Sequence, residues 1–95
     1  MVKPYRSKLR LTLDVLGAIE RESVDGPALV TRVLVACNLT YPRLQEHLDA
    51  MLAKGWVEPV NAGAKRSWRL TEAGRTAQTE LRRIDGALAD FGMGL

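Results

Sequence analysis

The sequence has 95 residues, a formal net charge of +3 and a single cysteine, Cys37. This length allows one domain with one modest core, and a lone cysteine excludes an intramolecular disulfide or a zinc cluster of its own. No apolar run approaches the roughly 20 residues that span a bilayer. No signal-peptide cleavage site follows the leucine-rich segment 9–19, so we expect an intracellular protein.

The basic residues are concentrated in two regions that lie far apart in the sequence. The first ten residues contain Lys3, Arg6, Lys8 and Arg10 and no acidic residue, and residues 65–83 contain six basic residues against two acidic ones. If folding brings the two regions to one side, they suit a polyanionic partner. An ordinary solvated surface with chance clustering is the alternative.

The first helix is predicted over residues 7–22. Ser7 is a suitable N-cap, and apolar residues follow it at helical spacing in two rows, one starting at Leu9 and the other at Leu11. A helix that is apolar on two sides is usually buried between neighbours. We therefore expect this helix to lie between the domain core and a partner subunit.

A second helix is predicted from Pro27 to Ala36 or Cys37, because proline suits the first position of a helix. Its valines weaken helix preference, so a strand over residues 29–37 is the competing prediction. Asn38 then indicates a turn, since its side chain tolerates a left-handed backbone.

Thr40 is predicted to cap a third helix that reaches Lys54 and ends at Gly55. The 3.6-residue period predicts a buried stripe, which consists of Leu44, Leu48, Met51 and Leu52. The opposite face carries mostly polar residues, namely Arg43, Glu46, Asp49, Ala50 and Lys54.

A two-stranded hairpin is predicted next. Residues 56–60 form its first strand, which Pro59 marks as an edge strand, and residues 61–64 form the turn. Residues 67–70 return, and Thr71 caps a fourth helix.

The fourth helix carries apolar residues at alternating spacings of four and three, which is a heptad seam. The seam consists of Ala77, Leu81, Ile84, Leu88 and Phe91. These side chains could pack on their own domain or against a second copy. We predict a homodimer, because the first three helices and the hairpin already supply a core and an exposed seam would leave an apolar patch.

The order of elements predicts an α+β, mainly α, winged helix-turn-helix in residues 1–71, with three helices and a β-hairpin wing. Residues 72–95 form a C-terminal dimerisation helix and tail. Three motifs carry a resemblance to a known family: Arg6-Ser7-Lys8-Leu9, Asn38-Leu39-Thr40-Tyr41 and Trp68-Arg69-Leu70-Thr71-Glu72-Ala73-Gly74. With them the chain resembles the small archaeal winged-helix DNA-binding proteins that dimerise through a C-terminal antiparallel coiled coil. The resemblance implies sequence-tolerant binding of duplex DNA by a homodimer.

Three groups of residues are predicted to contact DNA: the basic amino-terminal arm, the third helix and the wing. In winged helices of this kind the third helix enters the major groove, while basic residues on the other two elements bind phosphates. The predicted contacts are Arg6, Lys8, Arg10, Thr40, Tyr41, Arg43, Lys54, Lys65, Arg66 and Arg69. On this reading the protein is a transcriptional regulator or a chromatin-type duplex binder in the cytoplasm, associated with the nucleoid.

Two other functions stay open. Glu46 and Asp49 lie on the outward face of the third helix, where carboxylates repel phosphate, and they favour a winged-helix protein-interaction module in a larger assembly without DNA binding. A ligand-sensing regulator with a pocket at the dimer seam is the third possibility. The sequence has no glycine-rich phosphate loop, nucleophile motif or recognisable His–carboxylate pair, so we predict no enzyme activity, no cofactor and no metal.

Overall fold

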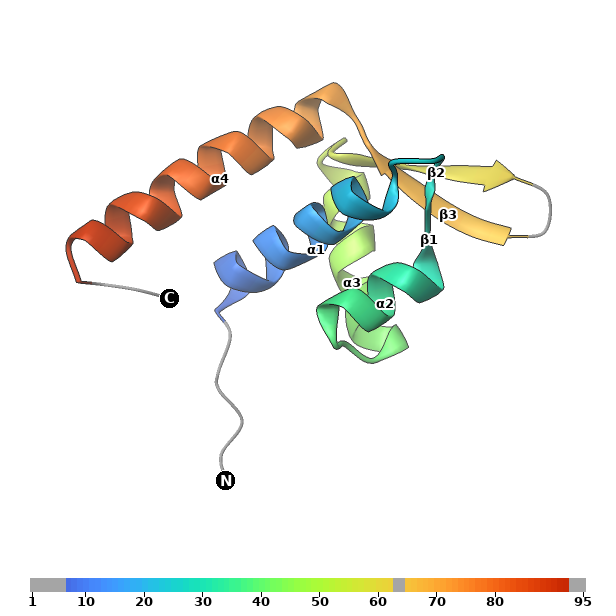
Figure 1. Cartoon of the computed structure of the whole chain (residues 1–95), viewed down its shortest axis with the longest axis horizontal. Helices are drawn as coiled ribbons and strands as arrows, with labels where there is room; N and C mark the ends of the chain where they lie inside the picture. The colour runs from blue at the N-terminus through green and yellow to red at the C-terminus, as the bar shows by residue number, and fades with distance from the viewer. Residues whose placement is uncertain (1–6, 63–64, 93–95) are drawn as a thin grey trace.

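The computed structural model describes residues 7–62 and 65–92 of the chain. Its elements in chain order are α1 (Lys8–Glu22), β1 (Ala28–Leu29), α2 (Val30–Cys37), α3 (Tyr41–Ala53), β2 (Val57–Ala62), β3 (Lys65–Leu70) and α4 (Glu72–Asp90). Figure 1 shows α1, α2 and α3 gathered beside the hairpin of β2 and β3, while α4 leaves in the opposite direction and runs beside α1. The predicted class, mainly helical with a β-hairpin, is confirmed.

The core is built around α1, which packs against α2, α3, β3 and α4. Val15, Leu16, Ala18 and Ile19 are completely shielded from solvent, which confirms that this helix is buried on more than one side. Leu44, Leu48 and Met51 of α3 belong to the same buried cluster. Leu52 was predicted in that buried stripe but is 43% exposed, because it lies one helical step beyond the face that meets the core.

Two of the predicted helix caps form hydrogen bonds. The hydroxyl of Ser7 accepts from the backbone N–H of Arg10 at 3.1 Å, and that of Thr71 accepts from the N–H of Gly74 at 3.0 Å. Each satisfies an amide that has no partner within its helix. Thr40 occupies the N-cap position of α3, but its side chain makes no capping hydrogen bond.

The predicted start of the second helix is wrong. Ala28 and Leu29 form a short strand that pairs with β3, opposite Trp68 and Ser67, and α2 begins only at Val30. The backbone groups before Val30 find partners across the sheet, so a helix start at Pro27 is not needed to satisfy them. The competing strand over residues 29–37 is also wrong beyond Leu29, since Val30–Cys37 is helical. Asn38 has the predicted left-handed backbone, with φ 53° and ψ 48°.

The sheet has the order β1-β3-β2 and is antiparallel throughout. β2 is therefore an edge strand, as Pro59 indicates. Behind the sheet, α4 begins tightly against the chain at Trp56: the N–H of Thr71 donates to the Trp56 carbonyl at 3.0 Å. A Cβ on Gly74 would lie 2.0 Å from that carbonyl oxygen, so only glycine lets the first turn of α4 approach the hairpin this closely. Within the described residues, no helix is both long enough and apolar enough to cross a membrane.

Candidate nucleic-acid interface

The wing and the start of α3 are joined by the side chain of Arg66. From β3, this guanidinium donates hydrogen bonds to the hydroxyl of Tyr41 and, at 3.2 Å, to Oε1 of Gln45. Its Cζ also lies 5.8 Å from the centroid of the Tyr41 ring, a distance at which a cation is attracted to an aromatic face. Tyr41 and Arg66 were predicted separately as contacts, and the fold brings them together on one exposed surface.

Gln45 extends this surface along α3. Its Nε2 donates to Oδ1 of Asp49 at 2.8 Å, one helical turn further on. Sequence reasoning missed Gln45, although a glutamine four residues before an aspartate is a pair that forms hydrogen bonds on a helix. The same bond gives the Asp49 carboxylate a hydrogen-bond partner within the protein.

The other predicted residues of α3 are exposed but lie apart from Arg66. Thr40 and Arg43 stand near the start of the helix, and Lys54 stands at its end. Arg43 forms no ion pair within the described residues, and the Lys54 Nζ lies 5.3 Å from the Trp56 ring centroid. Two basic side chains therefore remain available on this helix, one near each end.

Lys8 and Arg10, the amino-terminal cations within the described residues, lie far from the wing. Figure 1 shows the start of α1 on the opposite side of the domain from the hairpin. Lys8 is exposed there, while Nη2 of Arg10 forms an ion pair of 2.6 Å with Oδ2 of Asp85 in α4. Arg6 lies outside the described residues. Among the described residues, Lys8 and Arg10 thus lie apart from the wing, and Arg10 is engaged within the chain.

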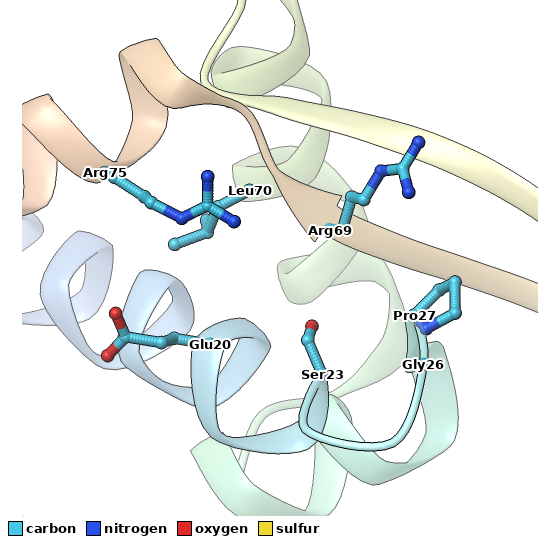
Figure 2. A pocket seen from close by; sticks show the side chains of 7 residues that line it. All are labelled: Glu20, Ser23, Gly26, Pro27, Arg69, Leu70 and Arg75. Carbon is cyan, nitrogen blue, oxygen red and sulfur yellow. The ribbon is translucent and has the colours of Figure 1, made fainter.

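Arg69 lies on the other face of β3 from Arg66, as the two-residue period of a strand requires for positions three apart. Its Nε donates to Oε1 of Glu58 on β2 at 2.6 Å. The side chain also borders a hollow of about 270 Å³, whose other lining residues are Glu20, Ser23, Gly26, Pro27, Leu70 and Arg75. Figure 2 shows Arg75 of α4 and Leu70 on one side of this hollow and Glu20 of α1 on the other. The side chain of Lys65, at the wing tip, is outside the described residues.

The predicted seam on α4 divides into a covered and an open part. Leu81 packs against the core, and Ala77 and Leu88 are half-buried. Ile84 is 45% exposed and Phe91 is 80% exposed. In Figure 1 the last turns of α4 extend past the beginning of α1, and the described elements of the chain leave Ile84 and Phe91 largely uncovered.

Polar contacts hold the rest of α4 to α1. Besides the Arg10–Asp85 pair, Nη2 of Arg82 lies 3.8 Å from Oε1 of Glu20. Arg83 instead pairs with Glu80 on its own helix at 2.7 Å, and that hydrogen bond, followed by the Glu80 charge, raises the pKa of the Arg83 guanidinium. No cluster of three or more His, Cys, Asp or Glu side chains that could hold a metal occurs in the described part of the chain.

Residues 5–88 match a family described as winged helix-turn-helix. The chain belongs to the winged helix-turn-helix family. Searching the curated proteins finds no match for this sequence.

Solved structures share the winged-helix fold. The DNA-binding protein Sso10a-2 from Sulfolobus solfataricus superposes with a TM-score of 0.79 at 20% identity, over 90% of this chain and 85% of that one. AF1382 from Archaeoglobus fulgidus gives a TM-score of 0.70 at 12% identity, over 86% and 90%. The MarR family transcriptional regulator SPO1453 from Silicibacter pomeroyi DSS-3 gives 0.58 at 23% identity, with 87% of this chain covering 63% of the longer regulator. The winged-helix architecture is thus shared with proteins from archaea and bacteria.

Proposed function

We propose that this winged-helix protein binds double-stranded DNA as a homodimer and acts as a transcriptional regulator or chromatin-type duplex binder. In the proposed complex α3 enters the major groove and the wing follows the phosphate backbone. The observation that carries the proposal is the contact of Arg66 with Tyr41 and Gln45. It makes the wing and the start of α3 a single surface with a cation at its centre.

Charge on this surface supports the proposal. An arginine guanidinium has five N–H donors, and Arg66 uses two of its nitrogen atoms on Tyr41 and Gln45, so further N–H groups remain for a phosphate. Arg43 and Lys54 are exposed and are proposed as additional phosphate contacts. Lys8, exposed at the start of α1 on the other side of the domain, is proposed as a further one. Thr40, Lys65, Arg6, Arg10 and Arg69 complete the proposed set, the last two requiring that their present carboxylate partners be exchanged for phosphates.

The family and two structural relatives support the same class of function. One relative is described as a DNA-binding protein and another as a transcriptional regulator. Within the described residues no group of side chains could hold a metal, and we propose a binding protein without catalysis or cofactor, associated with the nucleoid.

Dimerisation is proposed through α4. Ile84 and Phe91 leave apolar area exposed on the heptad seam, and a second copy packed antiparallel would cover it. The short helix limits this coiled coil, so the amino-terminal half of α1 is proposed to contribute to the same interface.

A salt titration of duplex binding tests the DNA proposal. The logarithm of the affinity should fall linearly with the logarithm of the salt concentration, because bound cations release counterions from the duplex. Arg66→Glu should weaken binding and reduce the slope by about one per protomer. Arg83→Glu is the matched control, since it makes the same charge change on α4, away from the proposed surface.

Binding that does not respond to salt, or that Arg66→Glu and Arg83→Glu weaken equally, would contradict the proposal. Such a result would favour the protein-interaction module instead. Because Asp49 is hydrogen-bonded to Gln45, its presence on α3 does not by itself call for a protein partner.

A further inference from the structure

The amide of Gln45 is held between two charged groups. Arg66 donates to its Oε1 at 3.2 Å, and Asp49 accepts from its Nε2 at 2.8 Å. Arginine carries only donors and an ionised aspartate only acceptors, so the positions of the amide oxygen and nitrogen cannot be exchanged without losing both bonds. The side chain is therefore fixed in one orientation.

Each end of the amide keeps one unused hydrogen-bonding position. The oxygen has two lone pairs and the nitrogen has two hydrogens, and Arg66 and Asp49 use one of each. The Gln45 amide thus keeps an acceptor and a donor on its two terminal atoms. In the major groove adenine presents an N6–H donor beside the N7 acceptor, whereas guanine presents two acceptors. The free positions of Gln45 match adenine, and its oxygen would meet the O6 of guanine unfavourably.

We infer that Gln45 reads an A·T base pair in the major groove, and that Arg66 and Asp49 are positioning residues that hold its amide for this contact. The inference rests on the proposed function, because it requires α3 to enter the groove. It adds a sequence preference to a surface whose other groups, the arginines and lysine, recognise phosphates of any sequence.

The arrangement also explains why an acidic residue stands on a helix that faces DNA. Asp49 repels phosphate, but it is close enough to Gln45 to fix the amide nitrogen. The basic residues on the wing and α3 offset the affinity that Asp49 removes. Asp49 contributes selectivity, because it orients the amide of Gln45.

The test is selection of bound duplexes from a pool of randomised sequence, followed by affinity measurements on single duplexes. Wild type should enrich A·T at one position of each half-site. Replacing that pair by G·C should weaken binding by about tenfold to a hundredfold. Substituting 7-deazaadenine, which lacks the N7 acceptor, at this position should weaken wild-type binding as well, and this measurement needs no protein variant.

Three variants separate reading from positioning. Gln45→Ala and Gln45→Met, the second of similar length without hydrogen-bonding groups, should remove the preference while salt-dependent binding persists. Asp49→Ala should raise total affinity yet reduce the preference, because the amide then loses the partner of its nitrogen and only Arg66 still holds it. Glu46→Ala is the matched control. It removes a carboxylate from the residue that follows Gln45 on α3, so it should raise total affinity and leave the preference intact.

Salt-dependent binding without any base preference would overturn the inference and leave the proposed function standing. An A·T preference that survives Gln45→Ala and Gln45→Met would overturn it too. Absence of salt-dependent duplex binding would instead overturn the proposed function itself, so the two failures are distinguishable.

Discussion

Arg66 on the wing donates a hydrogen bond to the hydroxyl of Tyr41, which lies 25 positions earlier at the first residue of α3. The same guanidinium lies 5.8 Å from the Tyr41 ring centroid. A wing is a hairpin whose tip has few neighbours, so this contact fixes the direction of one of its cations relative to the helix. The contact thereby fixes the wing relative to α3, and these are the two elements that would contact the phosphate backbone and the major groove.

Tyr41→Phe should weaken duplex binding modestly, by about 0.5–1.5 kcal/mol or roughly two- to tenfold, because it removes one hydrogen bond to Arg66 and keeps the ring. Tyr41→Ala removes both interactions and should weaken binding further. Fluorescence anisotropy with a labelled duplex measures both effects. Equal affinities for wild type, Tyr41→Phe and Tyr41→Ala would show that the Arg66 contact has no part in binding.

The sequence predicted the local features of the fold well. The caps at Ser7 and Thr71 and the left-handed turn at Asn38 are found at the predicted positions, because a cap or such a turn depends on neighbouring residues only. Strand β1 could not be predicted in this way, since Ala28 is extended only because Trp68 lies opposite it. Pro27 predicted a helix start from local sequence alone, but residues 28–29 pair with β3 and the helix begins at Val30.

The candidate site was predicted in its members but not in its arrangement. Tyr41 and Arg66 were both expected, yet their contact depends on how the hairpin folds over α3. Arg10 appeared to belong to a basic arm until the fold placed Asp85 beside it. Gln45 carries no charge, so a search for basic residues passed over it, and only its two hydrogen-bond partners draw attention to it.

Gly74 and Gly86 lie on the same helix and should respond oppositely to alanine. A Cβ on Gly74 would lie 2.0 Å from the Trp56 carbonyl oxygen, whereas nothing lies within 4 Å of one on Gly86. Gly74→Ala should lower the free energy of unfolding by about 1–3 kcal/mol through overpacking. Gly86→Ala should raise it by about 0.5–1 kcal/mol through helix propensity. Urea unfolding at one protein concentration measures both, and stabilisation by Gly74→Ala would contradict the close approach of α4 to the hairpin.

Thr71 and Thr40 both occupy N-cap positions, but only Thr71 forms the capping bond. The Thr71 hydroxyl also donates to the carbonyl of Gly55 at 2.5 Å, so it joins the start of α4 to the end of α3. Thr71→Ala should lower the free energy of unfolding by about 1–2 kcal/mol, and Thr40→Ala by much less. Thermal unfolding monitored by circular dichroism distinguishes them, and equal losses would count against the cap at Thr71.

The heptad seam on α4 predicts that the protein has the molar mass of a dimer in solution. Phe91 is 80% exposed and Ile84 45% exposed, and covering both in a dimer would contribute on the order of 25 cal/mol for each Å² of apolar surface buried. Ile84→Asp and Phe91→Asp should each shift the protein from dimer to monomer, because a carboxylate in an apolar interface has no partner. Both positions are open in the single chain, so these changes should leave its own core intact. Leu81→Asp would be less informative, since Leu81 also packs on that core.

Val35→Asp is the control for these variants, because Val35 is 79% exposed on α2 and the same change there should leave the dimer whole. Sedimentation equilibrium at micromolar concentration measures the masses directly. If wild type sediments as a monomer, the dimer proposal fails at its first step. If Val35→Asp dissociates the protein and Phe91→Asp does not, the interface lies on α2 and the apolar end of α4 needs another explanation. A mass that halves only with the two α4 variants would identify this helix as the contact between copies.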